Sequence, residues 1–398
     1  MRDLRSLMPA LQNKKYFNYG GQGPLPLPSL EAITTSWNKV QHLGPFTNDI
    51  WPYVTSEIKT TKQLLANICD VTVSRIALTE NVTSGCVLPM LGIPFIPGDR
   101  ILISDCEHPG IMYACTELAH RQQLTVDILP VKHLRYGVDN LVGTEEALID
   151  SLDSKLRPNT RLVILSHLLW NTGQIMPISA VAEKLSAHPN TPYLLVDAAQ
   201  SFGQIPIKDA AAKADIYAFT GHKWACGPEG LGAVVTSERV LEESNPTLIG
   251  WRSLKNEGHI KEETTVPFHK DGRRFEVATS CIPLLAGLRS SLHLLANEGT
   301  EIERLKKIQA WSSQFWNGLQ SLKGVSSILE APPPAGLVSF TLNQMTSPQE
   351  VVKILGNQGL WIRDLEDPAC LRACFHITSV SEEIKMLNQA IKELTTTQ

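Results

Sequence analysis

The chain of 398 residues is 43% hydrophobic and 19% charged, and it carries a net charge of −4. This length and apolar content predict a large buried core divided between two or more lobes. The weak negative charge, without a long run of one sign, argues against nucleic acid or an anionic membrane as a partner. No stretch approaches the ~20 apolar residues of a membrane span, and the first residues show no apolar signal segment. The eight cysteines form no CxxC pair, which favours a reduced, cytoplasmic protein without a metal site.

Short apolar runs alternate with amphipathic helical patterns through the first two thirds of the chain. The predicted helices cover residues 55–68, 111–118, 144–152 and 178–185. The predicted strands are residues 76–79, 100–104, 125–129, 162–166, 193–196, 215–219 and 232–235. This alternation predicts an α/β fold with a mainly parallel, seven-stranded sheet covered by helices on both faces. The link between the last two strands is too short for a crossover helix, so one of the pair is expected to run antiparallel.

The pattern changes after about residue 274. The predicted elements there are helices at 283–297 and 302–322, a strand at 337–342, a helix at 348–356, a strand at 372–377 and a helix from 381. We therefore expect a large α/β domain over 16–273 and a smaller α+β domain over 274–398. Residues 1–15 are expected to pack on the smaller domain. Ligands of such sheets bind at the carboxyl ends of the strands.

Lys223 lies after a predicted buried strand, in the sequence Thr220-Gly221-His222-Lys223, and a glycine-rich turn follows it. A lysine amine on such a loop is a candidate to form a Schiff base with a carbonyl cofactor, above all pyridoxal phosphate. A lone lysine in this setting is more often an ordinary surface residue. The interpretation therefore depends on what the other strand ends supply.

Two strand ends supply groups that fit such a cofactor. Asp197 follows the strand at 193–196 and would pair with a protonated pyridine nitrogen, although helix N-capping is the plainer alternative. Thr83 and Ser84 open a helical stretch after the strand at 76–79. Hydroxyls and free amides at a helix N-terminus fit a phosphate dianion, with simple capping as the alternative.

His108 and Asn171 follow two further predicted strands. His108 would stack on an aromatic cofactor ring, although a loop histidine is more often structural. Asn171 would donate a hydrogen bond to the phenolic oxygen of the cofactor or to a substrate carboxylate. Its structural alternative is an asparagine turn before Gly173.

Two arginines near the C-terminus are candidates to bind a substrate carboxylate, because a planar guanidinium donates two parallel hydrogen bonds. Arg372 lies between apolar neighbours at a predicted strand start and is hard to explain as a surface residue. Arg363 is followed by Asp364, Glu366 and Asp367, so a local salt bridge is its alternative. We expect Arg372 to be the principal carboxylate ligand.

In this order the motifs resemble the class V aminotransferase, or cysteine-desulfurase-like, family of fold-type I pyridoxal phosphate enzymes, and most closely its cysteine and cystine C–S lyases. The resemblance runs from about Tyr16 to the C-terminus. Its matching segments are 17–23, Glu107-His108, Asp197-Ala198-Ala199-Gln200, Thr220-Gly221-His222-Lys223 and Arg274-Phe275-Glu276-Val277-Ala278-Thr279.

The resemblance implies pyridoxal 5'-phosphate as the cofactor and a role for each matching residue. The implied catalytic residues are Lys223, Asp197 and His108. The implied cofactor-binding residues are Lys223, Thr83, Ser84, His108, Asn171, Asp197, Gln200, Thr220, His222 and Thr279. The implied substrate-binding residues are Arg372, Arg363, Asn171, Gly20 and Trp251. It also implies a homodimer with interface active sites, in which Thr279 reaches the phosphate of the neighbouring subunit and Trp251 borders the site of the partner.

The sequence departs from the desulfurase pattern at the residue that takes up sulfur. Desulfurases that resemble this chain carry Arg-Thr-Gly-His-His-Cys, and the register that starts at Arg363 places Pro368 at the cysteine position. Proline has no nucleophile, and the acidic neighbours of Cys370 disfavour a thiolate. We therefore expect β-elimination, with a small-molecule sulfur amino acid as substrate. Cystine would give pyruvate, ammonia and cysteine persulfide, and cysteine would give sulfide. A thiol or sulfur-accepting protein would be a further partner, in sulfur supply to iron–sulfur clusters.

Four alternatives remain open. One is a cysteine desulfurase or selenocysteine lyase that uses Cys370, and another is an epimerase-like relative that acts on a larger amino-acid derivative. A non-catalytic scaffold that retains the fold would have no reason to keep Asp197, His222 and Lys223. A nicotinamide-dependent dehydrogenase is disfavoured because no GxGxxG follows the first strand.

Overall fold

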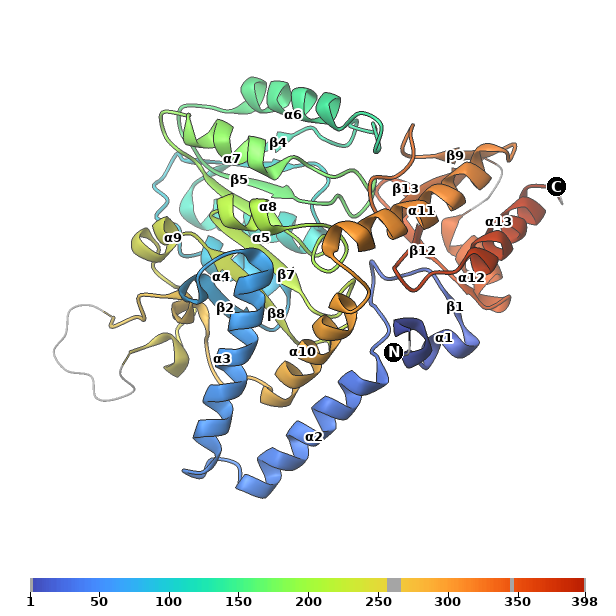
Figure 1. The fold of residues 1–398 in the computed structure, drawn as a ribbon. Helices are drawn as coiled ribbons and strands as arrows, with labels where there is room; N and C mark the ends of the chain where they lie inside the picture. The colour runs from blue at the N-terminus through green and yellow to red at the C-terminus, as the bar shows by residue number, and fades with distance from the viewer. Residues whose placement is uncertain (1–2, 256–265, 344–346, 397–398) are drawn as a thin grey trace.

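A seven-stranded mixed sheet forms the centre of the protein (Figure 1). The structure, a computed structural model, describes residues 3–255, 266–343 and 347–396. The strands lie in the order β2 (Ile76–Thr79), β8 (Gly232–Thr236), β7 (Ile216–Thr220), β6 (Tyr193–Asp197), β5 (Thr160–Ser166), β3 (Arg100–Ser104) and β4 (Thr125–Leu129). β8 runs antiparallel to both of its neighbours, and the other pairs are parallel. The predicted sheet and its antiparallel strand are therefore confirmed.

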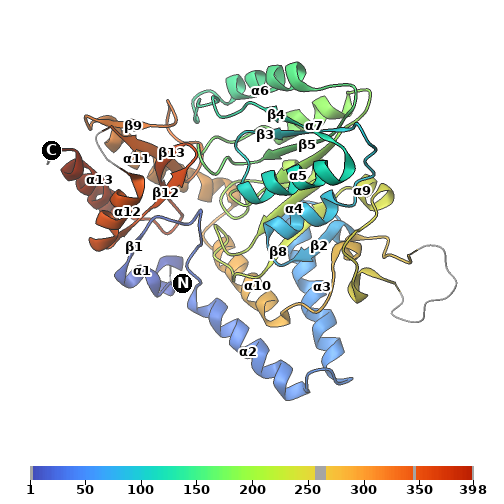
Figure 2. The same cartoon turned by 180° about the vertical axis from the view of Figure 1, so that it is seen from behind.

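Helices cover both faces of this sheet (Figures 1 and 2). The face seen in front in Figure 2 carries α4 (Val82–Met90), α5 (Pro109–Gln122) and α9 (Glu238–Glu243). The face seen in front in Figure 1 carries α3 (Ile50–Cys69), α6 (Leu141–Lys155), α7 (Ile178–Ser186) and α8 (Lys208–Lys213). Successive strand residues point to opposite faces, so Ile101 and Ile103 belong to one buried cluster and Leu102 to the other.

An extended pair of helices projects from this core. α2 (Leu27–Leu43) and α3 meet at their far ends, and α10 (Ile282–Ala296) packs against both. The sequence reading did not predict α2, because its mixed polar and apolar residues give only a weak periodic pattern. The helix begins at Leu27, with Pro28 in its first turn, where the missing amide hydrogen of proline is tolerated.

A four-stranded antiparallel sheet forms the C-terminal part of the chain. Its strands lie in the order β12 (Arg363–Glu366), β13 (Ala369–Cys374), β10 (Leu337–Leu342) and β9 (Val325–Ser327). Its helices are α11 (Glu301–Gln320), α12 (Pro348–Asn357) and α13 (Ser381–Thr396). The strand predicted at 372–377 is wrong in its bounds, because β12 and β13 form a hairpin that starts earlier and because the chain turns after Cys374, where the Ser379 hydroxyl accepts from the His376 amide.

The N-terminal residues lie against this C-terminal part. β1 (Lys15–Tyr16) pairs in parallel with β11 (Leu360–Trp361), and Arg5 forms an ion pair of 2.6 Å with Glu383 of α13. The remaining short elements are α1 (Ala10–Asn13) and the 3₁₀ turns Leu4–Leu7, Val73–Arg75, Trp251–Ser253 and Gly272–Phe275. Within the described ranges, no helix is long and apolar enough to cross a membrane, and no cluster of side chains has the composition of a metal site.

Candidate active site

A cavity of about 290 Å³ lies at the carboxyl ends of β5 and β6. It is lined by Gly20, Gly21, Asn81, Val82, Thr83, His108, Ser166, Leu168, Trp170, Asp197, Ala199, Gln200, His222, Lys223, Arg363 and Arg372. Parallel strands bring their carboxyl ends to one edge of a sheet, and the two arginines reach that edge from β12 and β13. Nine of the residues singled out in the sequence therefore meet in one place.

Lys223 lies on the loop between β7 and β8, in the wall of the cavity. The N-terminal segment packs directly on this loop, where the Gly23 amide donates to the His222 carbonyl over 2.7 Å. A side chain on Gly23 would collide with the Lys223 carbonyl oxygen, so only glycine permits this approach. Burial lowers the pKa of Lys223 to about 8, and Asp197 opposes this shift. A larger fraction of this amine is therefore uncharged near neutral pH than for an ordinary lysine.

Asp197 ends β6 and is held by its own turn, where its Oδ1 accepts from the Ala199 amide over 2.8 Å. Burial raises the pKa of Asp197, and the hydrogen bond from the Ala199 amide and the charge of Lys223 oppose that effect. Gln200 on the same turn donates to the Gly20 carbonyl over 2.9 Å. A cationic group placed against Asp197 would favour its ionised form.

A second buried carboxyl, Glu107, lies behind the cavity wall. It joins β3 to β5: the hydroxyls of Ser104 and Ser166 donate to it over 2.5 and 2.8 Å, and the Ser166 amide donates over 2.7 Å. Burial raises the pKa of Glu107 to about 7, with Asp197 as the next cause. Ser166 pairs with Asp197 in the sheet. Glu107 therefore holds together the strand ends next to His108 and Asp197.

His108 caps α5, and its ring meets the indole of Trp170 edge-on, with centroids 5.8 Å apart. Its Nδ1 accepts from the Gly110 amide over 3.2 Å. Burial and the Lys223 cation both lower the pKa of His108. A neutral imidazole therefore forms one side of the cavity, and such a ring packs well on a flat aromatic ligand.

The N-terminus of α4 forms another side of the cavity, through Asn81, Val82 and Thr83. The Asn81 side chain caps the helix by accepting from the Ser84 amide over 2.9 Å. The other amides of the first turn have no partner within the helix. Such a helix end attracts an anion such as phosphate.

Arg363 and Arg372 face each other across the β12–β13 hairpin. Like charges in opposed positions destabilise a sheet, and among the described residues neither arginine forms an ion pair. The Arg372 Nη1 donates to the Trp170 carbonyl over 2.8 Å, and its buried Nε has no partner. A Cβ on Gly20 would lie 2.8 Å from the Arg372 Nη2. The local salt bridge, which was the alternative for Arg363, is not formed among the described residues, and Asp367 pairs with Lys132. The two guanidinium groups are therefore suited to a carboxylate ligand.

Five of the predicted residues do not line the cavity. Asn171 donates to the Asp367 carbonyl over 3.2 Å and so ties the hairpin turn to the large sheet. Thr220 bonds the His222 Nδ1 over 2.8 Å, and Ser84 contributes its amide to the α4 cap. Trp251 and Thr279 lie together in another groove, formed mainly by α2 and α3.

Seven lining residues were not predicted as functional. Three of them carry polar or aromatic side chains, namely Asn81, Ser166 and Trp170. Trp170 stands next to Asn171, directly after a predicted strand. Large aromatic residues usually belong to the core, so the sequence pattern favoured Asn171, and not Trp170, as the functional residue. The unusual position of a tryptophan at the carboxyl end of a parallel strand is the signal that would have identified it.

Comparisons with known proteins agree with this geometry. The family model for class-V aminotransferases matches residues 43–387. A probable cysteine desulfurase from Methanothermobacter thermautotrophicus is 25% identical, with 98% of this chain and 97% of the relative aligned. An isopenicillin N epimerase from Amycolatopsis lactamdurans is 26% identical, with 99% and 97% aligned.

Two solved structures are more similar still. The cystine C–S lyase C-DES, in complex with its reaction product cysteine persulfide, is 39% identical with a TM-score of 0.88, and the match covers 97% of this chain and 99% of that one. A lysine-to-alanine mutant of C-DES, with glycine covalently linked to the pyridoxal phosphate cofactor, is 38% identical with a TM-score of 0.89, and covers 99% and 100%.

Proposed function

Because this chain belongs to the class-V aminotransferase family, whose members are pyridoxal phosphate-dependent enzymes, we propose that it cleaves the C–S bond of L-cystine by β-elimination. The products are pyruvate, ammonia and cysteine persulfide, and L-cysteine is a second substrate that yields sulfide. The observation that carries this proposal is the pair of opposed arginines beside Lys223, together with a hairpin that offers no accessible thiol.

The cavity fits pyridoxal phosphate. The α4 N-terminus with Thr83 would hold the phosphate, Asp197 would pair with the ring nitrogen, and His108 would cover the ring. The Lys223 amine would bind the aldehyde carbon. When bound, the cofactor supplies an electron sink for the electron pair released at the substrate Cα.

Side chains of the protein bind the substrate and transfer the proton. Arg372 binds the α-carboxylate, and Arg363, which is exposed at the mouth, meets the distal half of cystine. The Lys223 amine takes the Cα proton, for which an uncharged amine is required. Asp197 stays ionised beside the ring nitrogen and so keeps that nitrogen protonated. The electron pair from the Cα–H bond then expels the β-sulfur as a persulfide, and addition of one water to the remaining three-carbon fragment gives pyruvate and ammonia.

Cys370 supports elimination rather than transfer of sulfur to the protein. It is buried in β13, where it belongs to an apolar cluster with Ile328 and Leu365 against Trp170. Burial raises the pKa of the Cys370 thiol to about 11, so at neutral pH it is not a thiolate nucleophile. Of the eight cysteines only Cys281 is exposed, and it lies in the groove with Thr279.

We therefore expect Cys370→Ala to retain the rate of pyruvate formation from cystine within about twofold. Loss of one buried sulfur costs stability, with a lower Tm expected from the cavity that it leaves, so activity is compared at a temperature well below both transitions. Pyruvate is measured by a coupled lactate dehydrogenase assay, and the persulfide by alkylation and mass spectrometry. A folded Cys370→Ala protein that has lost all activity would contradict elimination without a protein thiol.

The lowered pKa of Lys223 predicts how the rate of cofactor binding depends on pH. Only the uncharged amine attacks an aldehyde, so cofactor-free protein is expected to take up pyridoxal phosphate faster as pH rises, with a plateau above about 8. The appearance of the visible absorption band after mixing measures this rate. A rate that continues to rise towards the ~10.4 of an ordinary lysine would show that burial does not lower this pKa.

We further propose that the enzyme is a homodimer, and that the groove with Trp251 and Thr279 faces the active site of the partner. This groove of about 460 Å³ is lined by exposed aromatic side chains, among them Trp37, Phe46 and Trp51. Exposed apolar surfaces of this kind usually mark interfaces. Trp51→Glu is expected to shift the sedimentation coefficient from dimer to monomer and to lower activity, whereas Tyr113→Glu on exposed α5 leaves both unchanged. A wild-type protein that sediments as a monomer would refute the assembly.

A further inference from the structure

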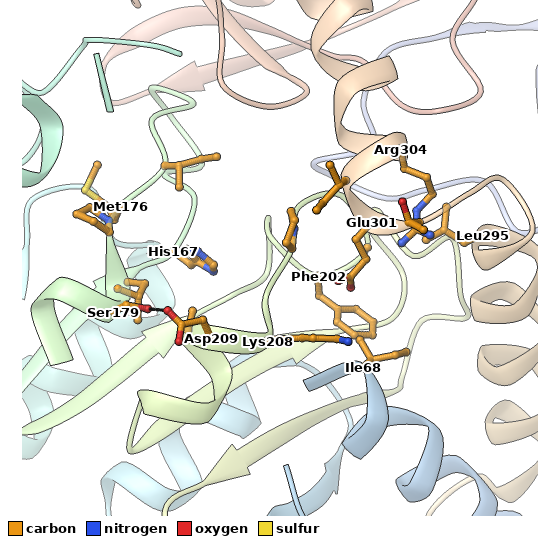
Figure 3. A pocket seen from close by; sticks show the side chains of 18 of the residues that line it. Ile68, His167, Met176, Ser179, Phe202, Lys208, Asp209, Leu295, Glu301 and Arg304 are labelled. Atoms are coloured by element: carbon orange, nitrogen blue, oxygen red, sulfur yellow. Dashed lines mark hydrogen bonds between the residues drawn. The ribbon is translucent and has the colours of Figure 1, made fainter. Parts of the chain in front are cut away.

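A second, larger cavity of about 930 Å³ lies between α3, α7, α8 and the start of α11 (Figure 3). Residues that are close neighbours in the sequence line this cavity and the active-site cavity. Ser166 and Gln200 line the active-site cavity, and the neighbouring His167 and Phe202 line the second one. Its volume is within the range of about 300–1,000 Å³ that is typical of small-molecule sites.

The interior of this cavity is largely apolar. Ile68, Met176, Phe202 and Leu295 line it from four separate segments (Figure 3). His167 adds one neutral polar group, because burial lowers its pKa to about 4 and its Nδ1 bonds the Tyr217 hydroxyl over 2.8 Å. The cavity would therefore accept a ligand with an apolar body.

Charged side chains of both signs line the same cavity. Glu301 and Arg304 lie on the first turn of α11, and Lys208 reaches in from α8. In the part of the chain that the structure describes, no ion pair joins these three residues. The Arg304 Nη1 donates only to the Gly299 carbonyl, over 2.6 Å, and its buried Nε has no partner. By contrast, Asp209 is already held by Ser179 and Lys213.

Arg304 is buried and Glu301 is half-buried, so their charges carry a desolvation cost that a ligand of complementary charge would offset. Burial raises the pKa of Glu301, and the nearby Arg304 and Lys208 oppose this shift without forming an ion pair with it. Glu145, on the exposed surface of α6, is the remaining charged group at the rim. An ammonium would pair with Glu301, and a carboxylate would pair with Lys208 and Arg304.

We propose that this cavity is a second binding site, for a zwitterionic α-amino acid with an apolar side chain. The ammonium of the ligand binds Glu301, its carboxylate binds Lys208 and Arg304, and its side chain packs on Phe202. The ligand joins α8 of the large sheet to α11, which continues into the C-terminal sheet. The ligand therefore binds beside the active site and does not enter the reaction.

The test uses N,N-dimethyl-L-leucine as the probe, because a tertiary amine keeps its positive charge but cannot form a Schiff base with the cofactor. Calorimetry with the holoenzyme is expected to show one saturable site per chain. Glu301→Gln and Lys208→Met each remove a charged partner and are expected to weaken binding about tenfold or more. Glu146→Gln on α6 and Lys306→Met on α11, both exposed and outside the cavity lining, are the matched controls and leave the affinity unchanged.

Two single-charge analogues complete the test. The probe without its amine, 4-methylpentanoate, and the probe without its carboxylate, N,N-dimethyl-3-methylbutylamine, are both expected to bind more weakly than the zwitterion. No saturable heat with the zwitterion, or equal affinity in Glu301→Gln, Lys208→Met and wild type, would overturn the proposal. Binding that is lost in Arg372→Leu but kept in the cavity variants would also overturn it, since the probe would then occupy the active site. None of these readouts depends on turnover of cystine. Failure of the second-site proposal can therefore be distinguished from failure of the proposed function.

Discussion

Lys223→Ala is expected to abolish pyruvate formation from cystine and to remove the visible absorption band of the bound cofactor. The variant lacks both the covalent link to the cofactor and the base for the Cα proton. Loss of a positioned base alone typically costs on the order of 10²–10⁴ in rate. Absorbance of the purified protein and a pyruvate assay measure the two effects. Lys132→Met, which removes an ion pair with Asp367 outside the cavity, is the matched control and keeps the band.

An unchanged absorption band in Lys223→Ala would show that another lysine holds the cofactor. Nothing in the geometry favours this, because Lys223 is the one lysine among the described residues that line the cavity. A lost band with normal turnover would remove Lys223 from the chemistry and leave it only a role in cofactor retention. Both outcomes would contradict the assignment.

The second large effect is expected at Arg372. Arg372→Leu removes a charge-assisted contact worth about 1.5–3 kcal/mol, so kcat/KM for cystine should fall roughly ten- to a hundredfold. Most of the change is expected in KM, because the carboxylate is bound before and during the reaction. Arg363→Leu should have a smaller effect, since its side chain is exposed and screened by solvent.

Arg372→Lys separates charge from geometry. Lysine keeps the positive charge but lacks the planar fork, so we expect intermediate activity. Because Arg372 is only 1% exposed, the Tm of each variant is measured beside its kinetics. A stable Arg372→Leu protein with an unchanged KM, or a larger loss in Arg363→Leu, would show that the carboxylate binds elsewhere.

The sequence predicted the central sheet well because buried parallel strands are short, continuous apolar runs that few other structures produce. The run at 193–196, for example, lies within β6, whose residues are all buried. Local pattern predicted the hairpin of β12 and β13 poorly. Its acidic residues and Pro368 resemble a loop, and only pairing with β10 makes it part of a sheet. The weakly amphipathic α2 is likewise specified by its packing on α10 rather than by its own periodicity.

The sequence predicted which residues come together where position along the chain alone determines location. Asp197, His108 and Lys223 each follow a strand of the same sheet, so their convergence followed from topology. Asn171 also follows a strand, but its side chain turns to the Asp367 carbonyl, a direction that no spacing rule determines. Thr279 and Trp251 lie in the aromatic groove, and their proposed role depends on a second subunit.

The nature of the three-carbon product from cystine tests the proposed elimination most directly. Holoenzyme is incubated with L-cystine, the small molecules are identified by mass spectrometry, and the intact protein is weighed in the same sample. We expect pyruvate and cysteine persulfide in equal amounts over many turnovers, with Cys370 unmodified. Alanine in place of pyruvate, together with a protein that has gained a sulfur atom on Cys370, would contradict elimination and identify the enzyme as a desulfurase.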